Sequence, residues 1–209
     1  MAKLLGVRQQ RVQFFYDTDF LVNGAVTSGD NLARSQKQLF ASASIGDLTR
    51  SNMPSPGYLS GDQTFLTYAV RHEIGFYAGT GDLVPEATST AEVMWLTLHC
   101  STFRYQVGEK VEFEGPVTMT PAGGGPWGFV SDSAQPLITN GQPQNKSIYV
   151  LPLPIAVAKR QGIRVEELKN DLAGAPGGTS VSVVNAINDY DGFKVFRCYI
   201  DGFNTRDVQ

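Results

Sequence analysis

The sequence contains few charged residues. Only 18% of its 209 residues are Asp, Glu, Lys or Arg, against about 25% in an average soluble domain. The net charge of −3 excludes a global positive field that would attract nucleic acid. Hydrophobic residues make up 42% of the chain and aromatic residues 11%, which excludes a charge-stabilised disordered chain. A weakly charged surface suits a protein that is buried against partners.

Cysteine and histidine are scarce. Cys100 and Cys198 are the only cysteines, too few for a disulfide scaffold or for a zinc site made of cysteines alone. Their apolar surroundings favour two buried free thiols, and a single disulfide stays open because sequence does not place them in space. His72 and His99 are the only histidines. A cupin-type metal site needs a His-x-His pair, whereas His72 has only Glu73 beside it, on the opposite face of a strand. We predict no metal and no other cofactor.

Long apolar runs and catalytic motifs are also absent. No stretch of about 18 uncharged apolar residues predicts a membrane-spanning helix, and the start MAKLLGVRQQ lacks the apolar core of a signal peptide. We therefore expect the protein to stay in the cell that makes it until that cell lyses. No Gly-x-Ser-x-Gly motif occurs, and the glycine run at 123–128 contains Pro126 and Trp127 where a phosphate loop needs lysine. Glu112 and Glu114 share a strand face and indicate a solvated surface. We predict that the protein is not an enzyme.

Turn residues divide most of the chain into short strand-like segments. The 22 glycines and 11 prolines separate runs of β-branched and aromatic residues. We predict strands over 64–77, 91–107, 110–121, 147–160, 163–168 and 193–200, and a strand or a helical turn over 182–189. An Asp-Gly turn at Asp201-Gly202 is predicted to follow the last strand. Pro152 and Pro154 confine one strand to an edge or a bulge. With long connections over 78–90, 122–146 and 169–181, this pattern predicts an all-β fold, a jelly-roll-like antiparallel β-sandwich over 61–209.

Residues 1–60 differ from the rest of the chain. Small and polar residues interrupted by Pro54, Pro56 and Gly57 predict an N-terminal arm that lies on the body or on a neighbouring subunit. The alternative is an N-terminal extension of the main sheet. Asp30 is a suitable N-cap for a short amphipathic helix over 31–40.

The apolar residues of this arm form a cluster that is too large to leave in water. Together with Trp127 in the glycine-rich loop, they are our candidates for contacts between subunits: Phe14, Phe15, Tyr16 and Phe20, with Leu21 and Val22 beside them. Six basic and four acidic residues give the arm a net charge of +2, against −5 for the remainder. A weak contact with a genome or an anionic lipid would use that charge, and contact with a neighbouring subunit explains it equally well.

The segments KVFRCYIDGFNTRDVQ and QKQLFASASIGDLTRSNMPSPGYLSGDQTFLTYAVRHEIGFYA look like those of virion proteins of bacterial viruses. The pattern of arm, eight-stranded sandwich and loops gathered at the ends resembles, over residues 60–209, the single jelly-roll capsid proteins of tail-less icosahedral bacteriophages. The resemblance implies a virion structural protein, made in the host cytoplasm. Such a protein forms or decorates the capsid shell by association with copies of itself and with other virion proteins.

Two other classes of function remain open at this point. One is a carbohydrate- or ligand-binding β-sandwich module of the phage fibre or adhesin type, in which Tyr105, Trp127 and Phe129 would stack on sugar rings. The other is a cupin-like metalloprotein built around the two histidines.

Overall fold

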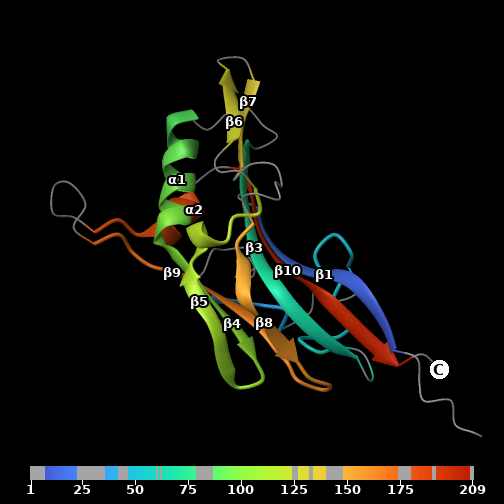
Figure 1. Cartoon of the computed structure of the whole chain (residues 1–209). Coiled ribbons are helices and arrows are strands. Elements are labelled where there is room, and N and C mark those ends of the chain that lie inside the picture. Colours follow the sequence, from blue (N-terminus) through green and yellow to red (C-terminus); the bar gives the residue numbers. More distant parts are fainter. Residues whose placement is uncertain are drawn as a thin grey trace, which may run out of the picture.

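The computed structural model covers the whole chain as two β-sheets packed face to face, with two short helices at one end (Figure 1). It describes residues 8–22, 36–41, 47–59, 61, 63–78, 87–123, 127–131, 134–139, 148–173, 180–189 and 192–207. The strands are β1 (Arg8–Val22), β2 (Gln36–Leu39), β3 (Thr64–Ala78), β4 (Ser101–Val107), β5 (Lys110–Pro116), β6 (Trp127–Ser131), β7 (Ala134–Thr139), β8 (Val150–Val157), β9 (Ile163–Lys169) and β10 (Gly192–Asp207). The helices are α1 (Ala87–Cys100), α2 (Val183–Asp189) and the 3-10 turn η1 (Val117–Met119).

The strand pairing is nested along the chain. If the β6–β7 hairpin is left aside, the first strand pairs with the last, β2 with β9, β3 with β8, and β4 with β5. The pairs β10·β3 and β9·β4 then close the ribbon into the sheets β1-β10-β3-β8 and β2-β9-β4-β5. We call these the first and the second sheet. Eight antiparallel strands wrapped in this way form a jelly roll, which confirms the predicted fold class.

The β6–β7 hairpin joins the first sheet on the same edge of β3 as β8, but farther along that strand. Both β7 and β8 pair with β3, β8 at Phe65–Ala69 and β7 at Gly75–Tyr77. Between them the backbone of His72 bonds to the segment after η1, with 2.7 Å from His72 N to Thr120 O and 2.9 Å from Ala122 N to His72 O. The connection predicted over 122–146 thus contains two strands, and α1 lies beside them at the same end (Figure 1).

The described part of residues 1–60 belongs largely to the sandwich. Strand β1 pairs with β10 over its whole length, from Arg8↔Asp207 to Val22↔Phe193, and β2 is an edge strand of the second sheet. This arrangement corresponds to the alternative of an N-terminal extension of the sheet. The helix predicted over 31–40 is wrong where the chain is described, because Leu39 pairs with Val165 and fills the core. Asp30 lies outside the described residues.

Two further predicted elements are wrong. Residues 91–107 form the end of α1 followed by β4, because Val93, Met94 and Leu98 recur at helical spacing and bury one face of the helix. The turn predicted at Asp201-Gly202 is a bulge inside β10. A Cβ atom on Gly202 would lie 2.3 Å from the Phe65 ring, so only glycine fits there. Segment 182–189, left open between strand and helix, is α2.

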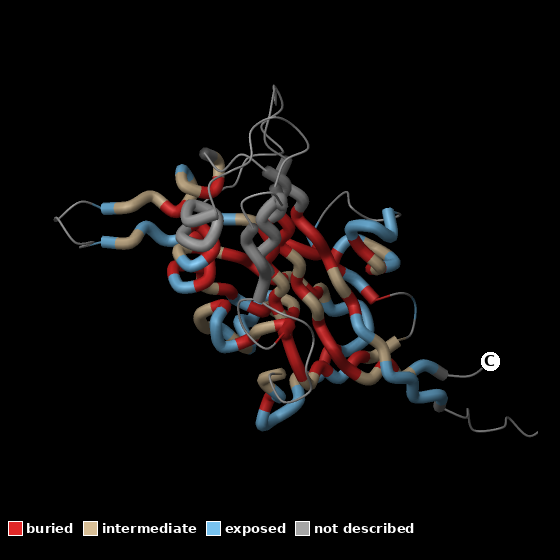
Figure 2. The backbone as a smooth tube through the Cα atoms, turned by 90° about the horizontal axis from the view of Figure 1, so that it is seen from above, coloured by how far each residue is buried: buried red, intermediate tan, exposed pale blue. Residues whose placement is uncertain are grey.

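The core lies between the two sheets and under the helices. Buried residues occupy the middle of the strands, and exposed ones gather in turns and outer loops (Figure 2). The largest buried side chains are mostly aromatic: Phe15, Phe40, Phe65, Phe76, Phe103 and Tyr105. Alternate strand residues must therefore point outward, and the two outer faces of the sandwich decide what the protein can contact.

Candidate interaction surface

The outer face of the second sheet is polar and charged. Its strand register aligns Gln38, Glu166, Arg104 and Glu114 in one row across all four strands. Arg104 Nε lies 3.2 Å from Glu114 Oε2, and its NH1 group lies 3.6 Å from Glu166 Oε2. Gln38, Arg104 and Glu114 are exposed to solvent and Glu166 is buried between its neighbours. Surface ion pairs of this kind gain little from being covered.

The outer face of the first sheet carries an apolar row instead. Val12, Phe203, Leu66 and Ala156 are register partners on β1, β10, β3 and β8 and point away from the core. Val12 is 74% exposed. We call these four residues the apolar row.

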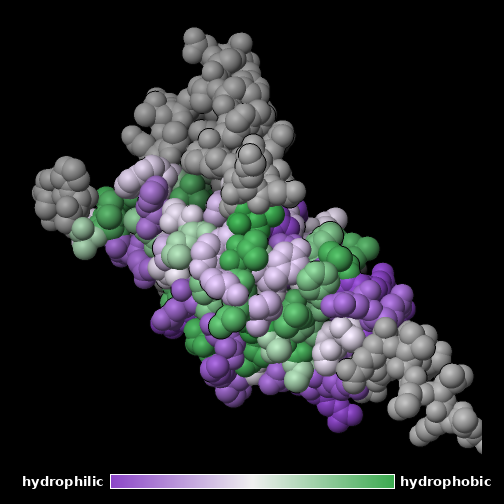
Figure 3. Space-filling view, viewed as in Figure 1, coloured by the Kyte–Doolittle hydropathy of each residue, from purple (hydrophilic) through white to green (hydrophobic). Residues whose placement is uncertain are grey.

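Further aromatic side chains widen the row. Phe14, which is 51% exposed, lies on the same face of β1 as Val12. The Tyr68 ring lies 5.6 Å from that of Phe203. In the view of Figure 3, hydrophobic side chains gather over the middle of the described body and hydrophilic ones toward its margins. Contiguous apolar surface of this kind is typical of interaction sites.

Charged residues beside the apolar row are paired with one another. Arg71 contacts both carboxylate oxygens of Asp201, at 2.5 and 2.9 Å. Arg197 lies 3.6 Å from Glu73, which also accepts a 2.6 Å hydrogen bond from the Tyr199 hydroxyl. Two cations thus face two carboxylates, and this part of the surface carries no net charge.

The tyrosine rings in this network are covered by guanidinium groups. The Arg71 guanidinium lies 4.7 Å from the centre of the Tyr199 ring, and that of Arg197 lies 5.6 Å from the Tyr16 ring. Burial, reinforced by the neighbouring Glu73, raises the pKa of Tyr199 to about 12. Burial alone would lower the pKa of Arg71. Its hydrogen bond to Asp201 and the charge of Asp201 outweigh this effect, so the pKa is raised. Arg71 therefore stays charged at neutral pH.

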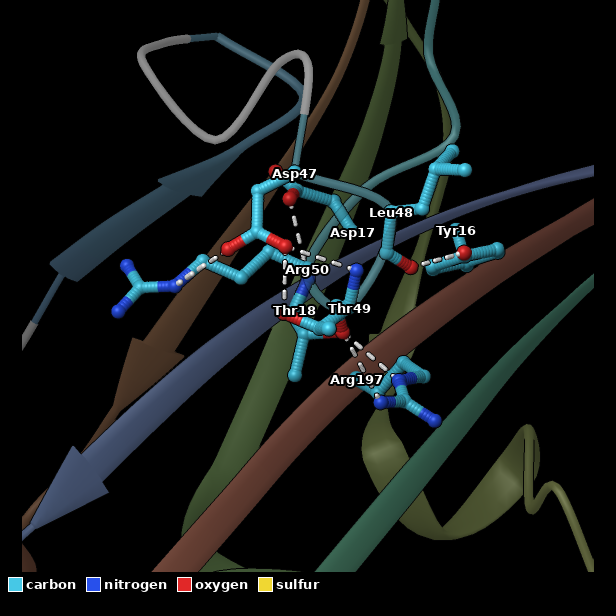
Figure 4. Close-up of polar contacts among 8 residues, drawn as sticks. All are labelled: Tyr16, Asp17, Thr18, Asp47, Leu48, Thr49, Arg50 and Arg197. Carbon is cyan, nitrogen blue, oxygen red and sulfur yellow. Dashed lines mark hydrogen bonds and ion pairs between the residues drawn. The ribbon is translucent and has the colours of Figure 1, made fainter.

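The loop 47–52 fastens the outer edge of β1. The Tyr16 hydroxyl donates a 2.5 Å hydrogen bond to Leu48 O (Figure 4). The Asn52 side chain accepts from Tyr16 N and donates to Phe14 O, both at 2.8 Å. The loop occupies backbone groups that a further strand would need, so this part of β1 is closed to strand addition.

A compact turn holds this loop in shape. Asp47 accepts hydrogen bonds from Thr49 N at 2.9 Å and from Thr49 Oγ1 at 2.6 Å, and these bonds lower the pKa of Asp47 (Figure 4). Arg197 reaches from β10 to Thr49 O at 3.4 Å. The turn is thereby joined to the same network that borders the apolar row.

The residues predicted to contact other subunits separate into three groups. Phe14 and Tyr16 lie on the outer face of the first sheet. Phe15 points the other way, is only 1% exposed and packs against Phe65 with ring centres 5.0 Å apart, so it is a core residue. The side chains of Phe20 and Trp127 lie outside the described part of the structure.

The register of the first sheet places Cys198 on β10 opposite His72 on β3, whereas His99 and Cys100 lie together at the end of α1. His72 is buried, with Nδ1 2.8 Å from Thr120 Oγ1, and burial lowers its pKa to about 3. His99 lies on α1 with its ring 4.7 Å from that of Trp95. Cys100 and Cys198 are buried free thiols, as predicted. Within the described ranges no group of three or more His, Cys, Asp and Glu residues is arranged to hold a metal ion.

The residues proposed to stack on sugar rings do not form a platform where the structure describes them. Tyr105 is fully buried, and its hydroxyl lies 2.7 Å from Thr67 Oγ1. Its predicted role in sugar binding is therefore wrong. The side chains of Trp127 and Phe129 lie outside the described residues.

A group of charged residues inside the sandwich was missed by the sequence reading. Lys37 lies 3.1 Å from Asp19 across the two sheets. Glu167 and Lys169, both buried on the inner face of β9, lie 3.8 Å apart. Burial raises the pKa of Glu167, against the lowering effect of Lys169. The alternation in IRVEELK, with Ile163 and Val165 facing inward, was the signal that could have located them.

Comparison with known proteins adds no family to this description. No family model matches the chain, and neither do any curated proteins or solved structures. None of the helices in the described ranges combines the length and apolar character needed to cross a bilayer. The fold and its two outer faces are what indicate a function.

Proposed function

We propose that this protein is a structural subunit that assembles with copies of itself, as a capsid protein does when it forms or decorates a virion shell. The observation that carries the proposal is the difference between the two outer faces, one crossed by an ionic row and the other by an apolar row. The jelly roll supports it less specifically, because lectins and cupins share that architecture with capsid proteins.

Covering the apolar row would be favourable. Full burial of a Val, Leu or Phe side chain contributes roughly 1.5–3 kcal/mol, and Val12 starts 74% exposed. The row crosses four strands and is widened by Phe14 and Tyr68. A partner face of similar width would remove all of these side chains from water together.

A second copy is the occupant that the charges favour. The cations beside the row are already paired, Arg71 with Asp201 and Arg197 with Glu73. Binding of nucleic acid or anionic lipid requires cationic side chains that are not already held in ion pairs within the protein. An equally neutral apolar face meets this surface without leaving a buried unpaired charge.

Val12→Lys tests the proposal at the most exposed position of the row. We expect the wild-type protein to form large assemblies and the variant to associate at least tenfold more weakly, because a lysine would be buried at the contact. Gln38→Lys, also on an exposed edge-strand position but in the second sheet, is the matched control. Size-exclusion chromatography with light scattering gives the mass, and negative-stain electron microscopy shows the particles.

Wild-type protein that stays monomeric at high concentration in every buffer tested would overturn the proposal. Equal assembly by Val12→Lys and the wild type would also overturn the role of the apolar row. Glycan binding by a strictly monomeric wild-type protein would support the carbohydrate-binding class instead.

A further inference from the structure

A second apolar surface lies at the edge of the sandwich where β8 and β5 meet. A groove of about 580 Å³ runs between these strands, lined by Glu112, Phe113 and the β8 residues Leu151–Ala156. Leu153, on the rim of the groove, is 81% exposed, the largest exposure among the described large hydrophobic residues. On the other side the Phe113 ring stacks on Tyr149 at 5.8 Å and meets Phe103 edge-on at 5.2 Å. The groove wall is thus fixed by core packing.

The backbone of β8 prevents this edge from adding another strand. Val150 pairs with Ala69 and Ile155 with Thr67, so residues 151–154 form a bulge between the two pairs. Pro152 and Pro154 lie in this bulge and have no backbone N–H to donate. A partner must therefore be held by side chains. The prolines on both sides of Leu153 limit its backbone freedom and keep the side chain presented to solvent.

We infer that the β8–β5 edge is a second contact between copies of this chain, related by a two-fold axis. In this contact Leu153 of each copy enters the groove of the other beside Phe113. The inference rests on the proposed function and names a further partner surface for the same assembly.

The geometry of closed assemblies is the first argument for a second copy. A two-fold contact uses the same patch on both subunits and ends at a dimer. If the apolar row forms such a contact, a shell requires at least one further, different surface.

The surface itself gives the second argument. The protruding Leu153 and the groove that can receive it lie on the same patch, so the patch is complementary to itself. Glu112 in the groove is paired with Lys110 at 3.0 Å, which leaves no unpaired charge to bury. Ala156 belongs both to the apolar row and to the groove lining, so the two surfaces are continuous.

Leu153→Asp, examined in the full chain, tests the inference. We expect assembly of Leu153→Asp to stop at the dimer formed through the apolar row. Assembly of Val12→Lys should stop at the dimer formed through the β8–β5 edge. The double variant Val12→Lys/Leu153→Asp should be monomeric. Its dimer dissociation constant should be at least tenfold higher than that of Val12→Lys. Leu48→Asp is the matched control, since Leu48 is also highly exposed but lies outside the groove. Analytical ultracentrifugation measures the masses, and circular dichroism checks the fold.

The outcomes separate the two proposals. A wild-type protein that never assembles overturns the proposed function. If the wild type assembles and Leu153→Asp assembles equally well, only the β8–β5 contact is overturned. If Val12→Lys forms chains longer than dimers, the two-fold arrangement is wrong, because a two-fold contact closes at two copies.

Discussion

Glu167 is buried inside the sandwich, although a glutamate side chain is usually exposed to solvent. It lies on the inner face of β9 among Asp17, Asp19, Lys37 and Lys169, and burial raises its pKa above the ordinary value of 4.5. The folded protein therefore holds the Glu167 proton more tightly than the unfolded chain does. The stabilisation from that proton is present at low pH and is lost as the pH rises through the folded-state pKa.

Glu167→Gln should change how the free energy of unfolding depends on pH. Because glutamine does not titrate, we expect the stability of the variant relative to the wild type to increase as the pH rises from 4.5 toward neutral. Urea denaturation at a series of pH values measures this difference. Glu114→Gln controls for the loss of a carboxylate from the outer surface. A relative stability of Glu167→Gln that falls with rising pH would contradict the assignment.

At the scale of elements, β1 serves both the core and the surface. Phe15 and Phe14 are neighbours in sequence, but one fills the space between the sheets and the other lies beside the apolar row. Because β1 pairs with β10 along its whole length, removing the first 30 residues would damage the sandwich itself. Single substitutions separate the two roles more cleanly than a truncation.

Phe15→Ala should therefore lower the free energy of unfolding by about 3–5 kcal/mol, the usual cost of removing a buried phenylalanine. Phe14→Ala should lower it by less than about 1 kcal/mol but weaken association of the folded protein. Chemical denaturation and light scattering measure the two effects separately. Equal losses of stability in both variants would show that Phe14 is part of the core.

The sequence alone was sufficient for elements whose local pattern agrees with their packing. The strands predicted over 64–77 and 163–168 from runs of β-branched and aromatic residues match β3 and β9 closely. The sequence misled at α1, where β-branched and aromatic residues favour a strand by composition, but Val93, Met94 and Leu98 contact the core with helical spacing. It also gave Asp201-Gly202 as a turn, since only the contact with Phe65 reveals the bulge. Tertiary contacts decide such segments.

The interaction surfaces required knowledge of the register between distant strands. Val12, Leu66, Ala156 and Phe203 are far apart in the sequence and become neighbours only through the nested pairing of the jelly roll. Phe14 and Tyr16 could be selected as exposed candidates from their apolar cluster. Phe15 could not be separated from them until the face of β1 that meets the core was known.

At the scale of the whole molecule, the sandwich has two unlike outer faces. The second sheet presents an ionic row to solvent, and the first presents the apolar row, which continues through Ala156 to the β8–β5 groove. A subunit with one solvated face and a continuous apolar surface on its other side is suited to assembly with copies of itself. The central claim is that the outer face of the first sheet is covered in that assembly.

Thiol labelling of a cysteine at position 12 tests this claim most directly. The native thiols Cys100 and Cys198 are buried, so a maleimide reagent would report on Val12→Cys, with Gln38→Cys in the second sheet as the control. If this face is covered, labelling of Val12→Cys slows at least tenfold between dilute and concentrated, assembled protein, while Gln38→Cys reacts at the same rate in both. Equal labelling of the two positions in the assembled protein would contradict the claim.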